Sequence, residues 1–247
     1  MKVIAITQAR YGSSRLPGKV LKTINGKKLL QIHLERAAKA KKIDKLIVAT
    51  TIEKEAIEIV SIAEQLRLTA YRGSINDVLD RYYQAAKNEL ADYVVRITSD
   101  CPLIDPRLMD KIIEICIVGN YDYCSNTIHP TYPDGTDVEI FKFSALEKAW
   151  KEAIATSDRE HVTPYIWRNS TAKGGTHFTS FNIKSDTDYS EYRLTVDENK
   201  DFELIEILVS EIGENKSWEE YVNFLHKNPA IFNINASIKR NEGYTER

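Results

Sequence analysis

The first loop of the chain reads Gln8-Ala9-Arg10-Tyr11-Gly12-Ser13-Ser14-Arg15-Leu16-Pro17-Gly18-Lys19. An apolar run at residues 3–6 precedes it and predicts a buried strand, and a helical pattern begins near Lys28. The loop is therefore expected to leave the carboxyl end of the first strand. In open α/β sheets, ligands bind at that end of the strands.

The loop combines three cations, Arg10, Arg15 and Lys19, with hydroxyl side chains and glycines. Glycines let a backbone approach a ligand closely, and free backbone N–H groups bind anions. The combination predicts a cradle for a polyphosphate, whereas a basic surface loop is the alternative for any single residue. The pattern is not a P-loop, because five residues separate Gly12 from Gly18 and no serine or threonine follows the lysine.

The string Gln-Ala-Arg-x-x-Ser-x-Arg-Leu-Pro-Gly-Lys resembles the signature of the cytidylyltransferases that make CMP-activated sugar acids, the CMP-KDO and CMP-sialic acid synthetases. The closest likeness is to the branch that serves spore-coat polysaccharide biosynthesis. The resemblance implies that the three cations hold the triphosphate of CTP and act in catalysis. The nucleotide contacts implied in this loop are Gln8, Ala9, Arg10, Ser14, Arg15 and Lys19.

The composition is that of an ordinary globular protein. Of its 247 residues, 43% are apolar and 28% are charged, which suits one large domain over residues 1–247. The net charge of −2, with interspersed signs, gives no basic patch for nucleic acid. No apolar run approaches the roughly 18 residues that span a bilayer, so we expect no membrane insertion and a cytoplasmic location. The three cysteines lack metal-ligand spacing and argue against a disulfide framework.

Strands and helices alternate along the first half of the chain. Helical apolar faces cover residues 30–37 and 59–66, and apolar runs at residues 45–50, 69–71 and 93–98 predict strands. This alternation predicts βαβ units and a mostly parallel sheet in an α/β fold. The resemblance implies a Rossmann-like three-layer αβα arrangement, the nucleotide-diphospho-sugar transferase fold.

A polar loop at residues 72–81 lies between a short strand and the next helix. Ser74 or Asn76 is a candidate N-cap of that helix. Because the loop follows the carboxyl end of a strand, a nucleotide contact is the competing interpretation. In the resembling family the matching segment helps to hold the cytidine, which implies contacts from Arg72, Ser74 and Asp77.

The clearest central strand, residues 93–98, ends abruptly at Ser99-Asp100-Cys101-Pro102. A carboxylate at a strand tip points into the crevice where phosphates would lie. It suits Mg²⁺, which takes one or two carboxylates together with substrate phosphates. A turn or helix-capping role is the alternative for Asp100. In the resembling family an aspartate at this place binds the metal, which makes Mg²⁺ the expected cofactor.

The same segment departs from the Gly-Asp-Glu-Pro of the CMP-KDO synthetases. Ser99 replaces the glycine, Cys101 replaces the glutamate, and Thr98, an expected nucleotide contact, stands where those enzymes carry glutamine. Contacts with the base and the sugar are therefore expected to differ. Cys101 is a poor candidate nucleophile, because the carboxylate of Asp100 beside it raises a thiol's pKa.

Two segments in the second half are candidates for binding a sugar. Residues 132–141 read as a Pro-Asp-Gly turn and a strand that puts Asp137 and Glu139 on one face, with a solvated face as the alternative. This string closely resembles the spore-coat branch. Farther along, an arginine offers a planar fork to a carboxylate, although a lone histidine is more often structural. The candidate sugar contacts are Tyr132, Asp137, Glu139, Arg159 and His161.

Residues 127–190 are expected to form a small insertion in the domain. A Gly174-Gly175 turn and an alternating run at residues 177–183 suggest a β-hairpin or an extended arm. Such an insertion resembles the dimerisation element of the family, which implies a homodimer.

A further acidic residue follows an expected strand at residues 191–196. Asp197 is a candidate helix cap. The pattern Leu-Thr-Val-Asp-x-x-x-Asp-Phe-Glu-Leu also resembles the segment that carries the family's second metal aspartate. The resemblance therefore implies that Asp100 and Asp197 together hold the metal and act in catalysis.

These motifs predict an enzyme that transfers CMP from CTP to an acidic sugar of the KDO or nonulosonate kind, releasing pyrophosphate, for surface polysaccharide biosynthesis. Two alternatives stay open. A glycosyltransferase with a nucleotide-sugar donor would typically show an Asp-x-Asp motif after a strand, which Ser99-Asp100-Cys101 lacks. A non-catalytic nucleotide-binding module would bind CTP without turning it over.

Overall fold

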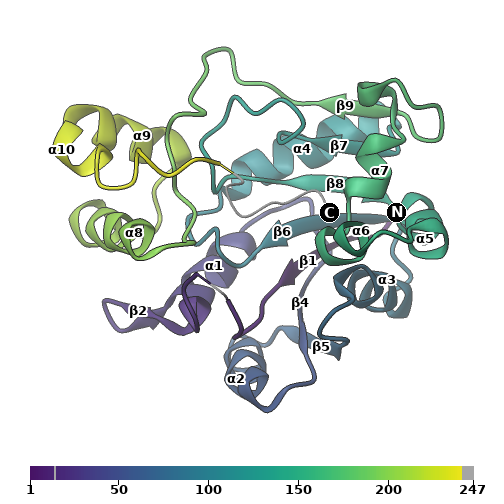
Figure 1. Cartoon of the computed structure of the whole chain (residues 1–247), viewed down its shortest axis with the longest axis horizontal. Helices are drawn as coiled ribbons and strands as arrows, with labels where there is room; N and C mark the ends of the chain where they lie inside the picture. Colours follow the sequence, from purple (N-terminus) through teal and green to yellow (C-terminus); the bar gives the residue numbers. More distant parts are fainter. Residues whose placement is uncertain (14, 241–247) are drawn as a thin grey trace.

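The computed structural model describes residues 1–13 and 15–240, which form a central sheet between two layers of helices (Figure 1). The sheet consists of β1 (Val3–Gln8), β4 (Lys45–Thr51), β5 (Thr69–Gly73), β6 (Tyr93–Thr98), β7 (Tyr123–Ser125), β8 (Glu139–Lys142) and β9 (Ser180–Asn182). The strand order is β5-β4-β1-β6-β8-β7-β9. Only β8 runs antiparallel to its neighbours within this sheet, so the predicted mostly parallel mixed sheet is confirmed.

The helices pack on both faces of the sheet. They are α1 (Leu29–Ala37), α2 (Ile57–Gln65), α3 (Val78–Asn88), α4 (Pro106–Val118), α5 (Phe143–Glu152), α6 (Thr156–His161), α7 (Pro164–Arg168), α8 (Asn199–Ile212), α9 (Trp218–Lys227) and α10 (Pro229–Phe232). None of these described helices is long and apolar enough to cross a membrane.

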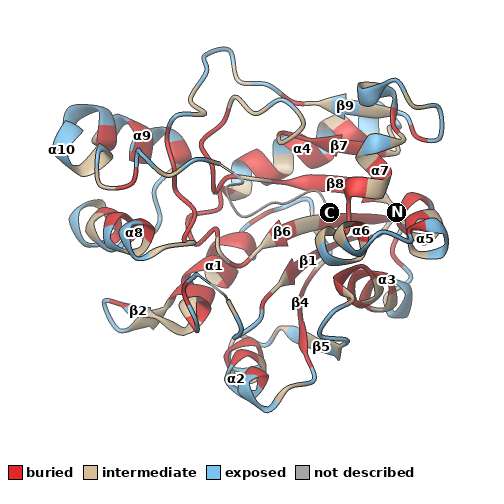
Figure 2. Cartoon of the chain, viewed as in Figure 1, coloured by how far each residue is buried: buried red, intermediate tan, exposed pale blue. Residues whose placement is uncertain are grey.

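Strand β1 supplies side chains to two separate cores, because successive residues of a strand point to opposite faces. Val3 and Ala5 pack with residues of α1, α2, α4, α8 and α9. Ile4 and Ile6 pack with residues of α3, α5 and α7. Figure 2 shows buried strands in the middle and exposed outer faces on the helices. The three-layer αβα arrangement that the sequence predicted is therefore confirmed.

The register of β1 and β6 places two loops at one edge of the sheet. The strands are parallel and in direct contact, and Gln8 at the end of β1 pairs with Thr98 at the end of β6. The first loop and the turn that carries Asp100 therefore emerge side by side. In the antiparallel neighbour β8, Glu139 pairs with Arg96 of β6, which brings a third segment to the same place.

The segment before Asp197 differs from the expected strand. Residues 191–196 form no ladder with a neighbour, and their contact with another segment is an isolated bridge between Arg193 and Asp134. The backbone N–H groups of Leu194 and Val196 bond to carbonyls in two different loops, those of Asp134 and Asp100. The alternation of apolar residues correctly indicated an extended chain. It could not predict which segments accept the hydrogen bonds of residues 191–196.

Residues 127–190 are built into the sheet and its helical layers. They contribute β8, which lies between β6 and β7, as well as β9 and helices α5 to α7. The expected hairpin or arm at residues 177–183 is wrong, because this run forms one short strand, β9, which pairs in parallel with β7 at the sheet edge. A two-stranded ribbon of β2 (Thr23–Ile24) and β3 (Lys27–Lys28) precedes α1 and had no clear signal in the sequence.

Candidate active site

A cavity of about 750 Å³ opens where β1 and β6 end. Its walls come from the first loop, the turn after β6, the turn before β8, residues 160–167, residues 195–197 and Arg240. It therefore occupies the place where open α/β sheets bind their ligands, outside the carboxyl ends of the parallel strands.

Many of the residues that the sequence singled out line this cavity. They are Gln8, Ala9, Arg10, Arg15, Lys19, Thr98, Asp100, Asp137, Glu139, His161 and Asp197. Five others, Arg72, Ser74, Asp77, Tyr132 and Arg159, are not part of its lining. Ser14 lies outside the described residues.

Lys19 lies between two aspartates that come from distant parts of the chain. Its Nζ is 3.0 Å from Oδ2 of Asp100 and 2.8 Å from Oδ1 of Asp197. Arg15 Nη2 is 3.1 Å from the same oxygen of Asp197. Burial disfavours the charged ammonium, but the two carboxylates outweigh it and raise the pKa of Lys19 above its ordinary value.

The carboxyl of Asp100 is held in its ionised form. Burial raises its pKa, but the ammonium of Lys19 and the hydroxyl of Thr98 act more strongly together and bring the pKa well below its usual range. The cavity thus carries two converging carboxylates with a cation shared between them.

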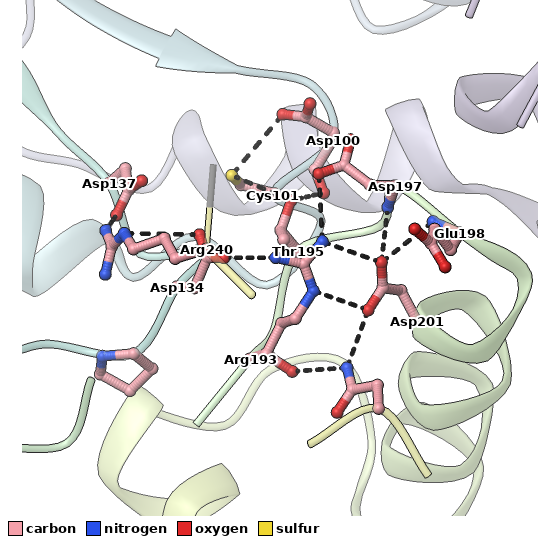
Figure 3. Close-up of polar contacts among 12 residues, drawn as sticks. Asp100, Cys101, Asp134, Asp137, Arg193, Thr195, Asp197, Glu198, Asp201 and Arg240 are labelled. Atoms are coloured by element: carbon pink, nitrogen blue, oxygen red, sulfur yellow. Dashed lines mark hydrogen bonds and ion pairs between the residues drawn. The ribbon is translucent and has the colours of Figure 1, made fainter. Parts of the chain in front are cut away.

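A buried network fixes the orientation of Asp197 (Figure 3). The Nη2 of Arg193 lies 3.1 Å from Oδ2 of Asp197, and the same guanidinium donates to the fully buried Asp201 at 2.8 and 3.0 Å. Asp201 also accepts the backbone N–H groups of Asp197 and Glu198 at 2.9 and 3.0 Å. Glu198 is the N-cap of α8 and forms a capping box with Asp201. Asp197 is therefore not the cap, and one of its oxygens faces the loop cations.

Asp100 is fixed through its backbone. Its carbonyl accepts the N–H of Val196 at 2.8 Å and the hydroxyl of Thr195 at 3.2 Å, which ties the two aspartate segments to each other. The next carbonyl, that of Cys101, lies 2.8 Å from Nδ1 of the buried His33 on α1. Helix α4 is capped by Asp105, so Asp100 has no capping role.

Cys101 is buried beside Asp100. Burial and the adjacent carboxylate raise the pKa of its thiol well above the ordinary value. The thiol is therefore protonated at neutral pH, as the sequence predicted, and it offers no nucleophile.

A second pair of acids, Asp134 and Asp137, also lines the cavity, and Figure 3 shows them beside Arg193 and Arg240. Asp134 lies 2.5 Å from Nη1 of Arg193, and Asp137 is paired with Arg240. The turn between the acids needs a glycine, because Gly135 has φ of +96° and a Cβ there would lie 2.4 Å from the backbone nitrogen of Thr195.

The family model described as Cytidylyltransferase matches residues 4–234. The chain belongs to the cytidylyltransferase family. This confirms the predicted family and makes the protein a nucleotidyltransferase.

Individual relatives cover nearly the whole cytidylyltransferase chain. An uncharacterized protein from Methanocaldococcus jannaschii is 43% identical over 255 residues, spanning 100% of this chain and 99% of that protein. Spore coat polysaccharide biosynthesis protein SpsF from Bacillus subtilis is 32% identical over 237 residues, spanning 92% and 95%. A solved cytidylyltransferase from Leptospira borgpetersenii serovar Hardjo-bovis has a TM-score of 0.89 and 34% identity, covering 97% of this chain and 100% of that one.

Glu139 of this cytidylyltransferase faces the cavity, but both of its oxygens have partners. One accepts the hydroxyl of Tyr123 at 2.5 Å and the other is paired with Arg96. His161 also lines the cavity, and burial followed by the charge of Arg96 lowers its pKa. Of the five predicted sugar contacts, Asp137, Glu139 and His161 are thus brought together.

The remaining predicted contacts serve other interactions. Arg72 donates to the carbonyls of Thr51, Ile52 and Glu53. Asp77, rather than Ser74 or Asn76, is the N-cap of α3 and is paired with Arg159. The Oγ of Ser74 accepts the N–H of Asp77 at 3.2 Å. The buried Tyr132 packs edge-on against Trp218.

Four arginines at the cytidylyltransferase site were not among the predicted contacts, and one of them, Arg96, lines the cavity from β6. Arg81 lines the cavity from within α3, and Arg240 reaches it from the far end of the described chain. Arg193 holds Asp197 from behind. Arg81 looked like part of a polar helix face, and the polar stretch around Arg240 has no periodicity that would have distinguished it. The spacing of Arg193 four residues before Asp197 was the one available signal, because it suits a local ion pair.

Proposed function

We propose that the protein transfers CMP from CTP to an acidic sugar and releases pyrophosphate. The observation that carries the proposal is the placement of Lys19 between Asp100 and Asp197, beside Arg15 and in one cavity with Arg10. The same cavity thus contains cations that would neutralise a triphosphate. It also contains two carboxylates that would hold a divalent ion. Membership of the cytidylyltransferase family supports CTP as the nucleotide.

Asp100 and Asp197 fit a divalent cation. One oxygen of each lies within 3.0 Å of a single positively charged atom, the Nζ of Lys19, so the two carboxylates already converge on one point. No group of three or more potential metal ligands is found among the described residues. Mg²⁺ suits a two-carboxylate site, because it completes its coordination with substrate phosphates and water. When bound there, it would polarise the α-phosphate and lower the pKa of the attacking hydroxyl.

The residues of the chain would then do most of their work by positioning. Arg10, Arg15 and Lys19 would neutralise the triphosphate and the departing pyrophosphate. A sugar hydroxyl oxygen would bond to the α-phosphorus as the bond to the bridging oxygen of the β-phosphate breaks. Its proton would pass to solvent, and no covalent enzyme intermediate is needed.

The acidic character of the sugar is the finer part of the proposal. Arg96, Lys173 and Arg240 also line the cavity and are cations that could attract a carboxylate. The relative named for spore coat polysaccharide biosynthesis supports a role in making a surface polysaccharide. Such a reaction draws on the CTP pool, which favours the cytoplasm.

A homodimer is a further part of the proposal. The edge strand β9 presents Phe181, which is 42% exposed and stacks on Tyr121, and edge strands with exposed apolar residues are suited to pairing. Light scattering is expected to give the mass of two chains for the wild type and of one chain for Phe181→Asp. A single-chain mass for the wild type would contradict the dimer and leave the chemistry untouched.

The test of the reaction is pyrophosphate release with Mg²⁺, each of four nucleoside triphosphates and a panel of acidic and neutral sugars. We expect release with CTP only, dependent on a sugar that carries a carboxylate. Release with a neutral sugar would overturn the acidic-sugar assignment. CTP binding without turnover for any sugar would favour a non-catalytic module. Release of a nucleoside diphosphate from a nucleotide-sugar donor would favour a glycosyltransferase.

A further inference from the structure

Two nitrogens of the Arg81 guanidinium are buried in the cavity wall and have no hydrogen-bond partner among the described residues. The residue is 1% exposed, and its Nε and Nη1 have no hydrogen-bond acceptor among the described residues. A buried charged donor without an acceptor is strongly unfavourable. Such a group usually indicates an acceptor that arrives with a ligand, and Arg81 lines the candidate active site.

Arg81 differs in this respect from the other arginines of the cavity. Arg10, Arg15, Arg96 and Arg240 each have a carboxylate within 4 Å in the described part of the chain. Within the same described part of the chain, no carboxylate lies within 4 Å of the Arg81 guanidinium. Its donors are therefore available to a ligand at no cost in broken ion pairs.

The position of Arg81 is set by β5 and α3, which pack side by side. A Cβ on Gly73, at the end of β5, would lie 2.8 Å from Cγ of Arg81 and 3.0 Å from Cε1 of Tyr71. Only a residue without a side chain leaves room for the arginine stem to cross the strand end. The arginine is thus held rather than free to turn into solvent.

A buried acceptor without a partner lines the same cavity. The Oε1 of Gln8, the last residue of β1, has no hydrogen-bond donor among the described residues. The cavity therefore offers a cation that can only donate and, at the end of the central strand, an amide oxygen that can accept.

These two residues match the hydrogen-bonding edge of cytosine. Cytosine presents acceptors at O2 and N3 and a donor at its exocyclic N4 amine. Uracil presents a donor at N3, which would face the guanidinium without an acceptor between them. A site that hydrogen-bonds one base strongly rejects an analogue that leaves its polar groups unpaired.

Resting on the proposed use of CTP, we propose that Arg81 reads the base, donating to N3 and O2 of cytosine, and that Gln8 Oε1 accepts from the N4 amine. The loop cations Arg10 and Arg15 are much more exposed and suit the hydrated phosphates. The buried guanidinium of Arg81 lines the cavity together with the apolar Val78, and such weakly hydrated surroundings suit a flat, uncharged base. Selection of CTP over UTP then resides in α3 and the end of β1.

The first test varies the ligand and leaves the protein intact. Calorimetry of the wild type, with Mg²⁺ and no sugar, would compare CTP, UTP and the triphosphate of 3-deazacytidine, which lacks the N3 acceptor. We expect UTP and the deaza compound to bind at least about 10-fold more weakly than CTP, as for loss of one hydrogen bond to a charged group. Equal binding of CTP and the deaza compound would overturn the reading of N3.

The second test varies the protein. Arg81→Met is expected to weaken CTP binding about 10- to 100-fold and UTP binding little, so that the preference between them collapses. Arg67→Met is the matched control, because Arg67 is exposed and outside the cavity lining, and the ratio of CTP to UTP affinity should not change. Thermal unfolding of both variants verifies that they are folded.

Other outcomes separate this inference from the proposed reaction. Equal losses for CTP and UTP in Arg81→Met would make Arg81 a phosphate ligand and overturn base reading. A changed ratio of CTP to UTP affinity in Arg67→Met alone would do the same. If CTP binds selectively but no sugar gives pyrophosphate, the proposed reaction fails and base reading stands. If the wild type binds neither nucleotide, both fail.

Discussion

Lys19 offsets the repulsion between Asp100 and Asp197 in the absence of a ligand. Two ionised carboxylates that converge on one point repel each other, and a buried like-charge pair normally forces one of them to take up a proton. Here the ammonium of Lys19 lies between Asp100 and Asp197, and the pKa of Asp100 is depressed rather than raised. The carboxylate of Asp100 is consequently ready to act as an oxygen ligand at neutral pH.

Replacing Asp100 tests its role at this scale. Asp100→Asn keeps the shape and removes the charge, so we expect pyrophosphate release to fall by roughly 100-fold or more, as for the loss of one preorganised electrostatic group. Asp188→Asn is the control, because Asp188 is exposed and outside the cavity lining. Initial rates measure the effect, and urea unfolding verifies the fold. Near-normal turnover in Asp100→Asn would remove it from the catalytic centre.

At the scale of single residues, the sequence predicted acids better than arginines. Asp100 and Asp197 follow extended runs and could be recognised from where those runs stop. Arg81 and Arg240 could not, because nothing local distinguishes a guanidinium that enters a cavity from one that covers a helix. Arg72 and Arg159 were predicted contacts, yet the first bonds to carbonyls and the second to Asp77. Which acceptor an arginine finds depends on tertiary packing.

At the scale of elements, the turn at residues 133–136 is in close contact with the segment that precedes Asp197. Gly135→Ala would bring a methyl group to 2.4 Å from the backbone of Thr195 in a left-handed conformation. We expect it to lower the free energy of unfolding by about 3 kcal/mol or more, since neither backbone can yield cheaply. Urea unfolding measures this difference.

Gly174→Ala is the matched control for that substitution. Gly174 also has a left-handed φ, +78°, but no atom lies within 4 Å of its would-be Cβ. It should therefore cost only the backbone strain, about 1 kcal/mol. Equal effects of the two substitutions would show that the backbone at residue 195 makes room for the added methyl group at no cost.

Helix α1 is joined to strand β1 and to the turn after β6 by one buried imidazole. Nε2 of His33 lies 2.9 Å from the hydroxyl of Thr7 on β1, and Nδ1 lies 2.8 Å from the carbonyl of Cys101. Burial lowers the pKa of His33 from 6.5 to about 4. The unfolded chain therefore binds a proton at pH 5 that the folded chain does not, so stability falls as pH falls.

The expected loss from His33 is about 2 kcal/mol between pH 7.5 and pH 5, and it levels off below about pH 4. Urea unfolding across this range would measure it. His33→Gln should remove the part of the pH dependence of unfolding free energy that His33 causes. His226→Gln, at an exposed position, should leave that part in place. The same pH slope in His33→Gln and the wild type would contradict a neutral buried His33.

Element types were predictable where apolar runs were long, as in β1, β4 and β6. The order of the strands beyond β6 was not. Strand β8 is inserted between β6 and β7, and β9 joins the edge in parallel with β7. Residues 177–183 alternate as a hairpin strand would, but alternation specifies which faces are buried and not which strand is the neighbour.

At the scale of the whole molecule, residues 235–240 complete a site that begins at residue 8. Asn235 donates to the carbonyl of Arg193 at 3.2 Å and to the carboxylate of Asp201 at 2.9 Å. Arg240 then pairs with Asp137 and donates to the carbonyl of Tyr132 at 3.3 Å. Segments from both ends of the described chain therefore line one cavity.

Removing the charge of Arg240 should affect the two substrates unequally. Arg240→Met leaves Asp134 and Asp137 with one arginine between them, so we expect the KM for an acidic sugar to rise about 10-fold while the KM for CTP stays the same. Lys239→Met removes the same charge at an exposed neighbour and should change neither value. Steady-state pyrophosphate release measures both. An equal rise in the two KM values would contradict the division of the cavity.

The lysine between the two aspartates also has a consequence for the order of events. A metal ion arriving alone must displace an ammonium that is already held by two short contacts, 3.0 and 2.8 Å long. Triphosphate oxygens would offer that ammonium a new partner, so the nucleotide would free the position that we propose for the metal. We therefore expect ordered addition, with the ion entering as its nucleotide complex and free Mg²⁺ binding too weakly to saturate the empty enzyme.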